Sequence, residues 1–383
     1  MNDFEILRQE PFLKIMQLLD DKAFFVGGCV RDVLSGKSVG DVDMATSFAP
    51  EEVIKRLQTA GYHVIPTGIK HGTVTVVLPT KETVEITTFR KDVKTDGRHA
   101  DVQFLSSMKE DAFRRDLTIN ALYLGADGKL YDFCDGVCDL KKKRVRFIGN
   151  AMQRIQEDAL RILRFFRFWG GFGGGVPDKQ AVKACRQCRT LLEKVSKERQ
   201  RDELLKILSL PRVIDVLRQM QKARILKILI PTSSTSLFQL QKLVSREKFL
   251  GLPSNPLLHL WVLSGTSTDL KLSNSQKDFF KKMSQAVRYP LKTQKDLLTV
   301  LYLFGPDVFK SCLLLRKKKI SFGAWLFYKQ LKAPIFPITA EDIRKKEGLS
   351  GKELGQKLKA YEQKWMLLGF PNEKKVVFSS KKE

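Results

Sequence analysis

The sequence predicts an α+β protein whose strands lie within the first 148 residues and whose remaining chain is helical. Two observations support strands: the short apolar run 23–26 is stopped by a glycine pair, and the segments 62–65, 73–78 and 83–89 are dominated by Val, Ile and Thr. A third supports helices, because residues 151–169 have apolar positions at helical spacing and apolar helical stretches recur to the end.

Length and composition describe an ordinary globular protein. The 383 residues suffice for two or more domains, and the hydrophobic fraction of 43% is typical. Charged residues interrupt every candidate membrane span, and the acidic start MNDFEILRQE lacks a signal-peptide core. We therefore expect a cytoplasmic protein without membrane contact.

The net charge of +26 is unevenly distributed along the chain. Residues 1–150 carry no net charge, whereas 151–240 carry +10 and 241–383 carry +16. This pattern favours a long polyanion, such as RNA, held by the rear of the molecule, although a basic surface can also serve solubility alone. The single C-x-x-C at 185–188 has no second pair at zinc spacing, which favours reduced structural cysteines.

The stretch 24–45 contains the first candidate site. Gly27 and Gly28 stand between a strand and a helix, where backbone N–H groups can approach a phosphate closely. Asp41 and Asp43 follow, and their spacing of two puts both carboxylates on one face of a strand. Paired carboxylates suit Mg²⁺, so the stretch predicts nucleotidyl transfer with two metal ions. Each feature alone is more often a plain turn or a solvated loop.

Further candidates follow in the first 148 residues. Glu85 is either a third carboxylate beside the aspartates or a solvent-facing strand residue. The charged segment 90–101 is expected to be a mobile loop near the site. Ser107 should cap a helix that carries the sequence RRDLTINA. We expect the guanidinium groups of Arg115, in this octet, and of Arg31 to hold a triphosphate. Asp116 and Asn120, also in the octet, are candidates to contact a ribose hydroxyl.

The predicted helix 151–169 carries a polar stripe with a spacing of three residues. Its members are Asp158, Arg161, Arg164 and Arg167. Residues three apart share much of one helical face, so a simple salt-bridge stripe over an apolar core face would also explain them.

In this order, the motifs resemble one family. GG-x-VRD followed by G-D-x-D, then RRDLTINA, then EDALRxLRFxRF, resemble the nucleotidyltransferase branch of class II CCA-adding enzymes and bacterial poly(A) polymerases. SKERQRDELLKIL (196–208) resembles the element that joins neck and body in this family. The resemblance implies a catalytic head with a small mixed sheet and helices (1–148), a helical neck that reads the base (149–212), and a helical body and tail that bind tRNA (213–383).

The resemblance also implies the reaction: addition of C, C and A to the tRNA 3′ end from CTP and ATP, with Mg²⁺ held by Asp41 and Asp43. Asp158 and Arg161 would be the protein template. Cytosine and adenine both present an amino group beside a ring-nitrogen acceptor, which match a carboxylate and an arginine. Uracil and guanine reverse these groups and would leave buried polar atoms unpaired. Arg164 and Arg167 would brace this pair or contact phosphate.

Three alternatives remain at this point. A poly(A) polymerase would share the head, but Gly68–Val74 and Ala159 argue against it, since the poly(A) branch tends to have proline at the latter position. A partial enzyme that adds only CC or only A fits the same motifs. A non-catalytic RNA-binding module would not require the intact pair Asp41 and Asp43.

Overall fold

The computed structural model describes residues 4, 7, 9–95, 100–104, 107–230, 233–266, 268–316 and 321–379. It contains two compact units. The first comprises Met1–Thr232 with Asp269–Lys271, and the second comprises Ser233–Thr268 with Leu272–Glu383. The first unit contains a mixed sheet, and helices make up the regular structure of the described part of the second, which confirms the predicted fold class.

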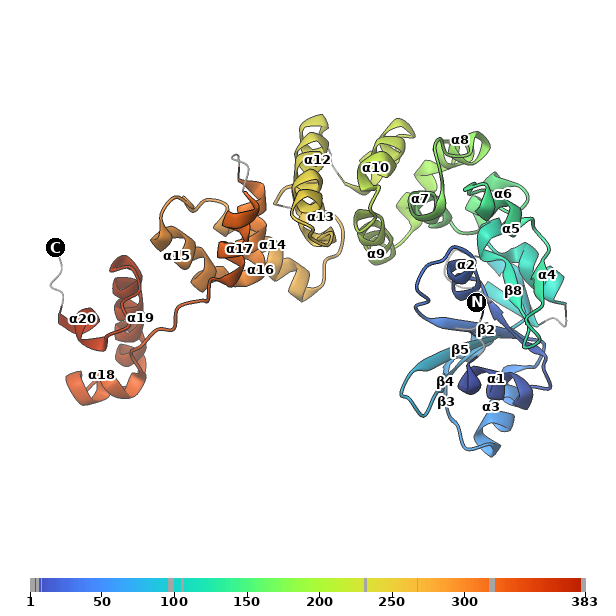
Figure 1. Ribbon diagram of the computed structural model, residues 1–383, viewed down its shortest axis with the longest axis horizontal. Coiled ribbons are helices and arrows are strands. Elements are labelled where there is room, and N and C mark those ends of the chain that lie inside the picture. Colours follow the sequence, from blue (N-terminus) through green and yellow to red (C-terminus); the bar gives the residue numbers. More distant parts are fainter. Residues whose placement is uncertain are drawn as a thin grey trace. The chain divides into compact units, whose positions relative to one another are not determined.

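A seven-stranded sheet forms the centre of the first unit (Figure 1). The order across the sheet is β3 (His63–Gly68), β4 (Thr73–Val77), β5 (Thr83–Thr88), β2 (Val42–Thr46), β1 (Ala23–Val26), β8 (Leu122–Leu124) and β9 (Leu130–Asp132). β2 and β5 are parallel, and the other neighbouring strands are antiparallel. The sheet is therefore mixed, as expected.

The alternation of side chains along β2 separates a core face from a polar face. Met44 belongs to the large apolar cluster under α1 (Glu10–Leu18) and α3 (Pro50–Thr59), which lie together beside the sheet in Figure 1. Ala45 belongs to a second cluster, on the opposite face. Because successive residues of a strand point to opposite faces, Asp43 shares the face of Ala45 and points away from the core under α1 and α3.

The described part of the first unit contains further helices besides α1 and α3. They are α2 (Gly28–Leu34), α4 (Met108–Arg114), α5 (Gly136–Lys141), α6 (Ala151–Glu157), α7 (Arg161–Phe172), α8 (Lys179–Gln187), α9 (Lys197–Leu208), α10 (Val213–Lys222) and α11 (Leu226–Leu229), with short 3₁₀ turns η1 (Ile69–His71), η2 (Thr118–Asn120) and η3 (Arg189–Lys194).

The prediction of one continuous helix over 151–169 is wrong. α6 ends at Glu157, and Asp158 is extended, with φ −149° and ψ 108°. The Oδ1 atom of Asp158 accepts the N–H of Leu160 at 3.1 Å. This side-chain hydrogen bond offers the backbone an alternative to the helix, so the chain turns before α7 begins at Arg161.

Two further local predictions are wrong. The segment 90–101 does not form a plain loop: it contributes β6 (Arg90–Thr95) and the start of β7 (Ala100–Phe104), which form an antiparallel hairpin, while 96–99 lie outside the described residues. The helix capped by Ser107 ends at Arg114. It stops there because the following backbone pairs with residues 146–148 instead.

The second unit contains α12 (Ser234–Phe249), α13 (Pro256–Ser264), α14 (Asn274–Ala286), α15 (Gln294–Phe304), α16 (Pro306–Leu315), α17 (Phe322–Gln330), α18 (Ala340–Glu347), α19 (Gly351–Leu367) and α20 (Lys374–Ser379). Trp365 is the centre of a small core near the C-terminus, and its ring lies edge-on to Phe370 at 4.9 Å. Among the described helices, none is both long and apolar enough to span a membrane.

Candidate active site

The glycine turn after β1 forms one wall of the site. Gly27 has φ +74°, a conformation that side chains with a Cβ rarely adopt, and it immediately precedes α2. A Cβ built on Gly27 would lie 3.4 Å from Nη1 of Arg115. The Arg115 guanidinium therefore lies against the turn, and the positive φ is what favours glycine at this position.

Three carboxylates lie on β2, just before it, and on the neighbouring strand β5. Asp43 on β2 lies in register with Glu85 on the parallel strand β5, and Asp41 precedes β2. Burial, followed by the charge of Glu85, raises the pKa of Asp43 to about 6, and Asp41 adds to the rise. The cluster thus has an excess of negative charge that a cation would stabilise.

A divalent cation fits these residues. Carboxylate oxygens are the hard ligands that such cations prefer, and the repulsion around Asp43 would be relieved on binding. The residues that the structure describes contain no group of three or more His, Cys, Asp or Glu placed to hold a metal ion. Asp41 and Asp43 would therefore supply two ligands, and phosphate oxygens or water the rest.

Arg115 is held by a buried hydrogen-bonded cluster. Its Nη2 atom donates to Oδ2 of Asp111 at 3.1 Å, and its Nε donates to the Tyr123 hydroxyl at 3.1 Å. Burial alone would raise the pKa of Asp111, but Arg115 and Arg114 outweigh it and lower that pKa to about 2. The guanidinium is thus fixed in orientation, which favours planar recognition of phosphate.

Arg31 is buried between polar and aromatic partners. Its Nη1 donates to Oδ1 of Asn120 at 2.6 Å, and it pairs with Asp32 at 2.9 Å. The guanidinium lies 4.3 Å from the ring centre of Phe172 and 4.9 Å from that of Phe168. These contacts tie α2 to α7.

Asp116 connects the segment after α4 to α7. Its Oδ2 accepts from Nε of Arg164 at 2.5 Å, and its Oδ1 accepts from Leu117 N–H and from Nδ2 of Asn120. Burial opposes the charge on Asp116, but Arg164 more than compensates and the pKa is lowered to about 2. Asp116 and Asn120 are therefore parts of one network.

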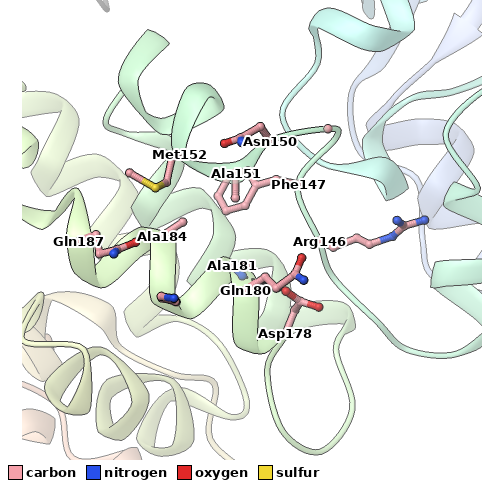
Figure 2. Close-up of a pocket in the computed structure, with 12 residues that line it drawn as sticks. Arg146, Phe147, Asn150, Ala151, Met152, Asp178, Gln180, Ala181, Ala184 and Gln187 are labelled. Carbon is pink, nitrogen blue, oxygen red and sulfur yellow. Dashed lines mark hydrogen bonds between the residues drawn. The ribbon is translucent and has the colours of Figure 1, made fainter.

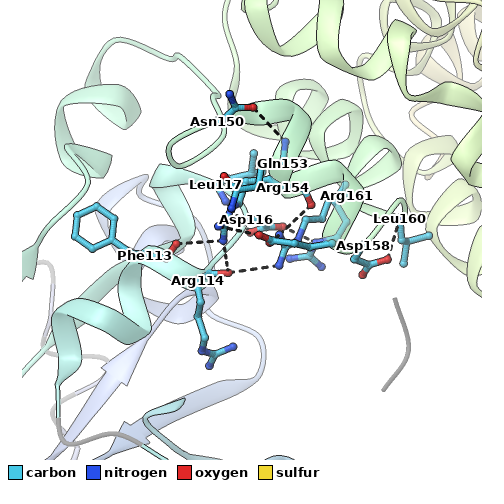
Figure 3. A network of polar contacts seen from close by, with 12 residues as sticks. Phe113, Arg114, Asp116, Leu117, Asn150, Gln153, Arg154, Asp158, Leu160 and Arg161 are labelled. Carbon is cyan, nitrogen blue, oxygen red and sulfur yellow. Dashed lines mark hydrogen bonds and ion pairs between the residues drawn. The ribbon is translucent and has the colours of Figure 1, made fainter. Parts of the chain in front are cut away.

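The predicted base-reading residues, Asp158 and Arg161, lie in a network of polar contacts (Figure 3). Asp158 accepts from Nη2 of Arg199 at 2.9 Å. Arg161 donates to Oε2 of Glu157 at 2.6 Å and to the carbonyl oxygen of Arg154 at 3.0 Å. Asp158 and Arg161 thus each have a defined orientation, set by different partners.

Phe168 is an aromatic platform on α7. Besides Arg31, the guanidiniums of Arg167 and Arg164 approach its ring centre to 4.1 and 5.4 Å. Arg167 is also ion-paired with Glu203 of α9. One ring therefore positions three cationic groups at the same wall.

A cavity of about 630 Å³ brings most of the predicted residues together. Those that line it are Gly27, Gly28, Arg31, Asp41, Asp43, Arg115, Asp116, Asn120, Asp158, Arg161, Arg164 and Arg167. Glu85 is not among the lining residues, although it stands beside Asp43 in the sheet.

Sequence reasoning missed five lining residues, namely Arg114, Leu160, Phe168, Arg199 and Lys206. Arg114 belongs to the octet that drew attention to Arg115, and Phe168 and Leu160 belong to the motif around Asp158. Arg199 and Lys206 lie on α9, within 196–208, and no pattern in that stretch indicated that it faces the site.

A second cavity of about 450 Å³ lies between residues 146–152 and α8 (Figure 2). Arg146 and Asp178 are at its edge, and Met152 and Phe147 contribute apolar surface. It contains none of the predicted site residues.

The fold and the large cavity define a nucleotidyltransferase head joined to a helical segment. Two family models agree: the one described as poly A polymerase head domain matches residues 23–146, and the one described as probable RNA and SrmB-binding site of polymerase A matches residues 177–236.

The similar proteins narrow this class. CCA tRNA nucleotidyltransferase 1, mitochondrial, from Mus musculus is 37% identical over 92% of this chain and 85% of its own length, and the Homo sapiens protein of the same name is 36% identical over the same shares. A solved structure of the Bacillus stearothermophilus CCA-adding enzyme in complex with CTP superposes with a TM-score of 0.74 at 28% identity, over 97% of this chain and 96% of that one. The chain belongs to the family of CCA-adding tRNA nucleotidyltransferases. Enzymes of this family use a divalent metal ion.

Proposed function

We propose that this chain adds C, C and A to the 3′ end of tRNA without a nucleic-acid template, taking CTP and ATP and releasing pyrophosphate. The observation that carries the proposal is the single cavity in which Asp41 and Asp43, the glycine turn, and the pair Asp158 and Arg161 meet. Relatives that share 36–37% identity over 92% of the chain bear names of this activity.

The charge of the cavity supports a nucleoside triphosphate as ligand. Seven arginines and one lysine line it, against four aspartates. Arg115 and Arg31 are the guanidiniums fixed beside the glycine turn, so we assign the triphosphate to them. Asp116 and Asn120, which are linked by a hydrogen bond, remain our candidates for the ribose hydroxyls.

The reaction follows from the proposed arrangement. The tRNA 3′-hydroxyl gives up its proton to solvent and attacks the α-phosphorus, the bond to the bridging oxygen breaks, and pyrophosphate leaves in line. Asp41 and Asp43 would hold Mg²⁺, which when bound supplies Lewis-acid stabilisation of the attacking and leaving oxygens. Glu85 is proposed as a supporting carboxylate, since its charge acts on Asp43 from the neighbouring strand.

Base choice is assigned to Asp158 and Arg161. A carboxylate that accepts from an amino group, beside a guanidinium that donates to a ring nitrogen, complements cytosine and adenine alike. Uracil and guanine would place a carbonyl against the carboxylate and an N–H against the guanidinium, which leaves unpaired polar groups. Arg164 and Arg167 brace this wall through Asp116 and Glu203.

We also propose a division of labour along the chain: a catalytic head at 1–148, a base-reading neck at 149–212, and a body and tail at 213–383 that hold the tRNA. The +16 charge of 241–383 supports contact between the rear part and RNA phosphates. The relatives from mouse and human are named mitochondrial, so the cytoplasm remains only our sequence-based prediction for this chain.

Primer extension on three tRNA transcripts tests the proposal. The transcripts end before CCA, after C, and after CC, and each receives CTP, ATP, both, or UTP with GTP in the presence of Mg²⁺. We expect completion of CCA followed by arrest. Long A tracts from ATP alone would indicate a poly(A) polymerase, and arrest at CC, or extension of only the CC transcript, a partial enzyme.

A pair of variants adds a control for the metal site. Asp43→Asn should abolish extension, whereas Glu51→Gln, which changes an exposed carboxylate in the first turn of α3, should leave it unchanged. Extension by Asp43→Asn at the wild-type rate would overturn the assignment of Asp43. A wild-type protein that binds tRNA but extends none of the transcripts would be an RNA-binding module without catalytic activity.

A further inference from the structure

Helix α9 forms a wall of the cavity that the proposed mechanism does not yet use. Arg199, Glu203 and Lys206 are spaced by four and three residues, so they share one face of this helix. Arg199 and Lys206 line the cavity, and Glu203 meets Arg167 of α7. The side of α9 that faces the site is therefore charged and paired with α7 and the turn before it.

Both carboxylate oxygens of Asp158 are engaged before any nucleotide binds. Oδ1 accepts the N–H of Leu160 at 3.1 Å, and Oδ2 accepts from Nη2 of Arg199 at 2.9 Å. The first contact fixes the turn between α6 and α7. The second comes from an element 41 residues away and fixes the direction in which Oδ2 points.

Arg161 gives Asp158 no comparable support. Its guanidinium is occupied by Glu157 and by the carbonyl oxygen of Arg154. The hydrogen bond from Arg199 of α9 therefore orients the Asp158 carboxylate, while Arg164 of α7 acts on that carboxylate through its charge. Each oxygen of an ionised carboxylate has two lone-pair directions, so an oxygen that already accepts from Arg199 can accept from a base as well.

We propose that Arg199 is a positioning residue for base selection, which aims the Asp158 carboxylate at the amino group of the incoming cytosine or adenine. This inference rests on the proposed function. Without Arg199, the carboxylate keeps only its bond to Leu160 and can rotate, so a water or a reoriented base can satisfy it. The cost of pairing with uracil or guanine then falls, and selectivity is lost before the chemical step is.

The competing explanation is that Arg199 has only a structural role, in which it holds α9 against the turn at Asp158. The two explanations predict different kinetics. If Arg199 only holds α9 in place, its loss lowers kcat/KM for all four nucleotides by a common factor. If Arg199 positions Asp158, its loss changes the ratio of kcat/KM for CTP to kcat/KM for UTP.

The test is single-nucleotide incorporation by the full chain. The transcript that lacks CCA receives CTP or UTP, and the transcript that ends in CC receives ATP or GTP, for the wild type and for Arg199→Met, Arg199→Gln and Arg199→Lys. The matched control is Arg201→Met, because Arg201 lies on the same helix, pairs with Asp202 and does not line the cavity.

We expect Arg199→Met to lower the CTP-to-UTP and ATP-to-GTP ratios of kcat/KM at least tenfold, mainly through a rise of KM for CTP and ATP. Arg199→Lys can still donate one hydrogen bond to Oδ2 and should recover part of the ratio, and Arg201→Met should keep it. If Arg199→Met does not fold, Arg199→Gln carries the same comparison.

Two results would overturn the inference. In the first, the Arg199 variants lose activity equally with all four nucleotides. Arg199 would then have only a structural role, and the proposed function would stand. The other is a wild-type protein that adds no nucleotide or does not prefer CTP and ATP, which would reject the proposed function itself.

Discussion

The ion pair between Asp116 and Arg164 offers a quantitative test of how head and neck are joined. Asp116 belongs to the segment after α4, Arg164 belongs to α7, and the Oδ2–Nε distance is 2.5 Å. The Asp116 side chain is 8% exposed and that of Arg164 is 34% exposed. The perturbations are Asp116→Asn, Arg164→Met and the double variant.

The magnitude can be worked out from the carboxylate. Its pKa falls from 3.8 to about 2, with Arg164 as the largest lowering influence after the opposing effect of burial. Each pKa unit corresponds to about 1.4 kcal/mol, so the folded state favours the charged form of Asp116 by roughly 2–3 kcal/mol after the opposing effect of burial. Because Asn120 shares in this, we expect a coupling energy of about 1–2 kcal/mol between Asp116 and Arg164 in a double-mutant cycle.

The assay is urea unfolding at pH 7, followed by far-ultraviolet circular dichroism and tryptophan fluorescence, with coincidence of the probes as the criterion for two-state analysis. The matched control is Asp20 with Arg56, an ion pair of 2.8 Å on the surface, which solvent should couple more weakly. A coupling for Asp116 and Arg164 no larger than that of this surface pair would refute the reasoning.

Three further outcomes follow from the same structure. Folding lowers the pKa values of Asp111 and Asp116 to about 2, so the stability that these carboxylates contribute is complete above about pH 4 and is lost as the pH falls to about 2. Asp111→Asn should therefore flatten the measured dependence of the unfolding free energy on pH between about pH 4 and 2. Asp43→Asn should lower kcat for nucleotide addition by about a thousandfold or more, because metal stabilisation is worth several kcal/mol, and should weaken Mn²⁺ binding in titration calorimetry. Gly27→Ala should cost roughly 1–3 kcal/mol in urea unfolding, because φ is +74° and the turn would have to shift. The shift should also raise KM for CTP, because Arg115 lies against this turn; an unchanged KM would contradict the placement of that guanidinium beside the phosphates.

Much of the fold could be predicted because its signals are local. The Val, Ile and Thr runs gave three neighbouring strands, and the glycine pair marked the end of β1, since each feature acts within a few residues. The same holds for the cavity residues that belong to short motifs, such as Asp43 and Arg115. Their types are dictated by phosphate and metal chemistry, whatever the rest of the chain does.

What could not be predicted depends on contacts that are distant in sequence. Nothing in 151–169 breaks a helix by propensity, and the break arises because Asp158 bonds to the N–H of Leu160 and to Arg199. The helix after Ser107 stops because residues 116–118 pair with 146–148. Arg199 and Lys206 line the cavity because α9 packs on α7. The residues of α9 alone do not indicate this packing, because it depends on side chains of α7 that are distant in the sequence.

The aromatic contacts of Arg31 have a consequence for how the first unit opens. Its guanidinium lies over Phe172 of α7, and Lys37, just beyond α2, donates to the carbonyl oxygen of Gly171 on the same helix at 2.7 Å. A local fluctuation that released α7 would also expose the arginine beside the glycine turn. The proposed head and neck therefore have different tasks but belong to one cooperative unit. Their backbone amides should exchange with solvent deuterium together.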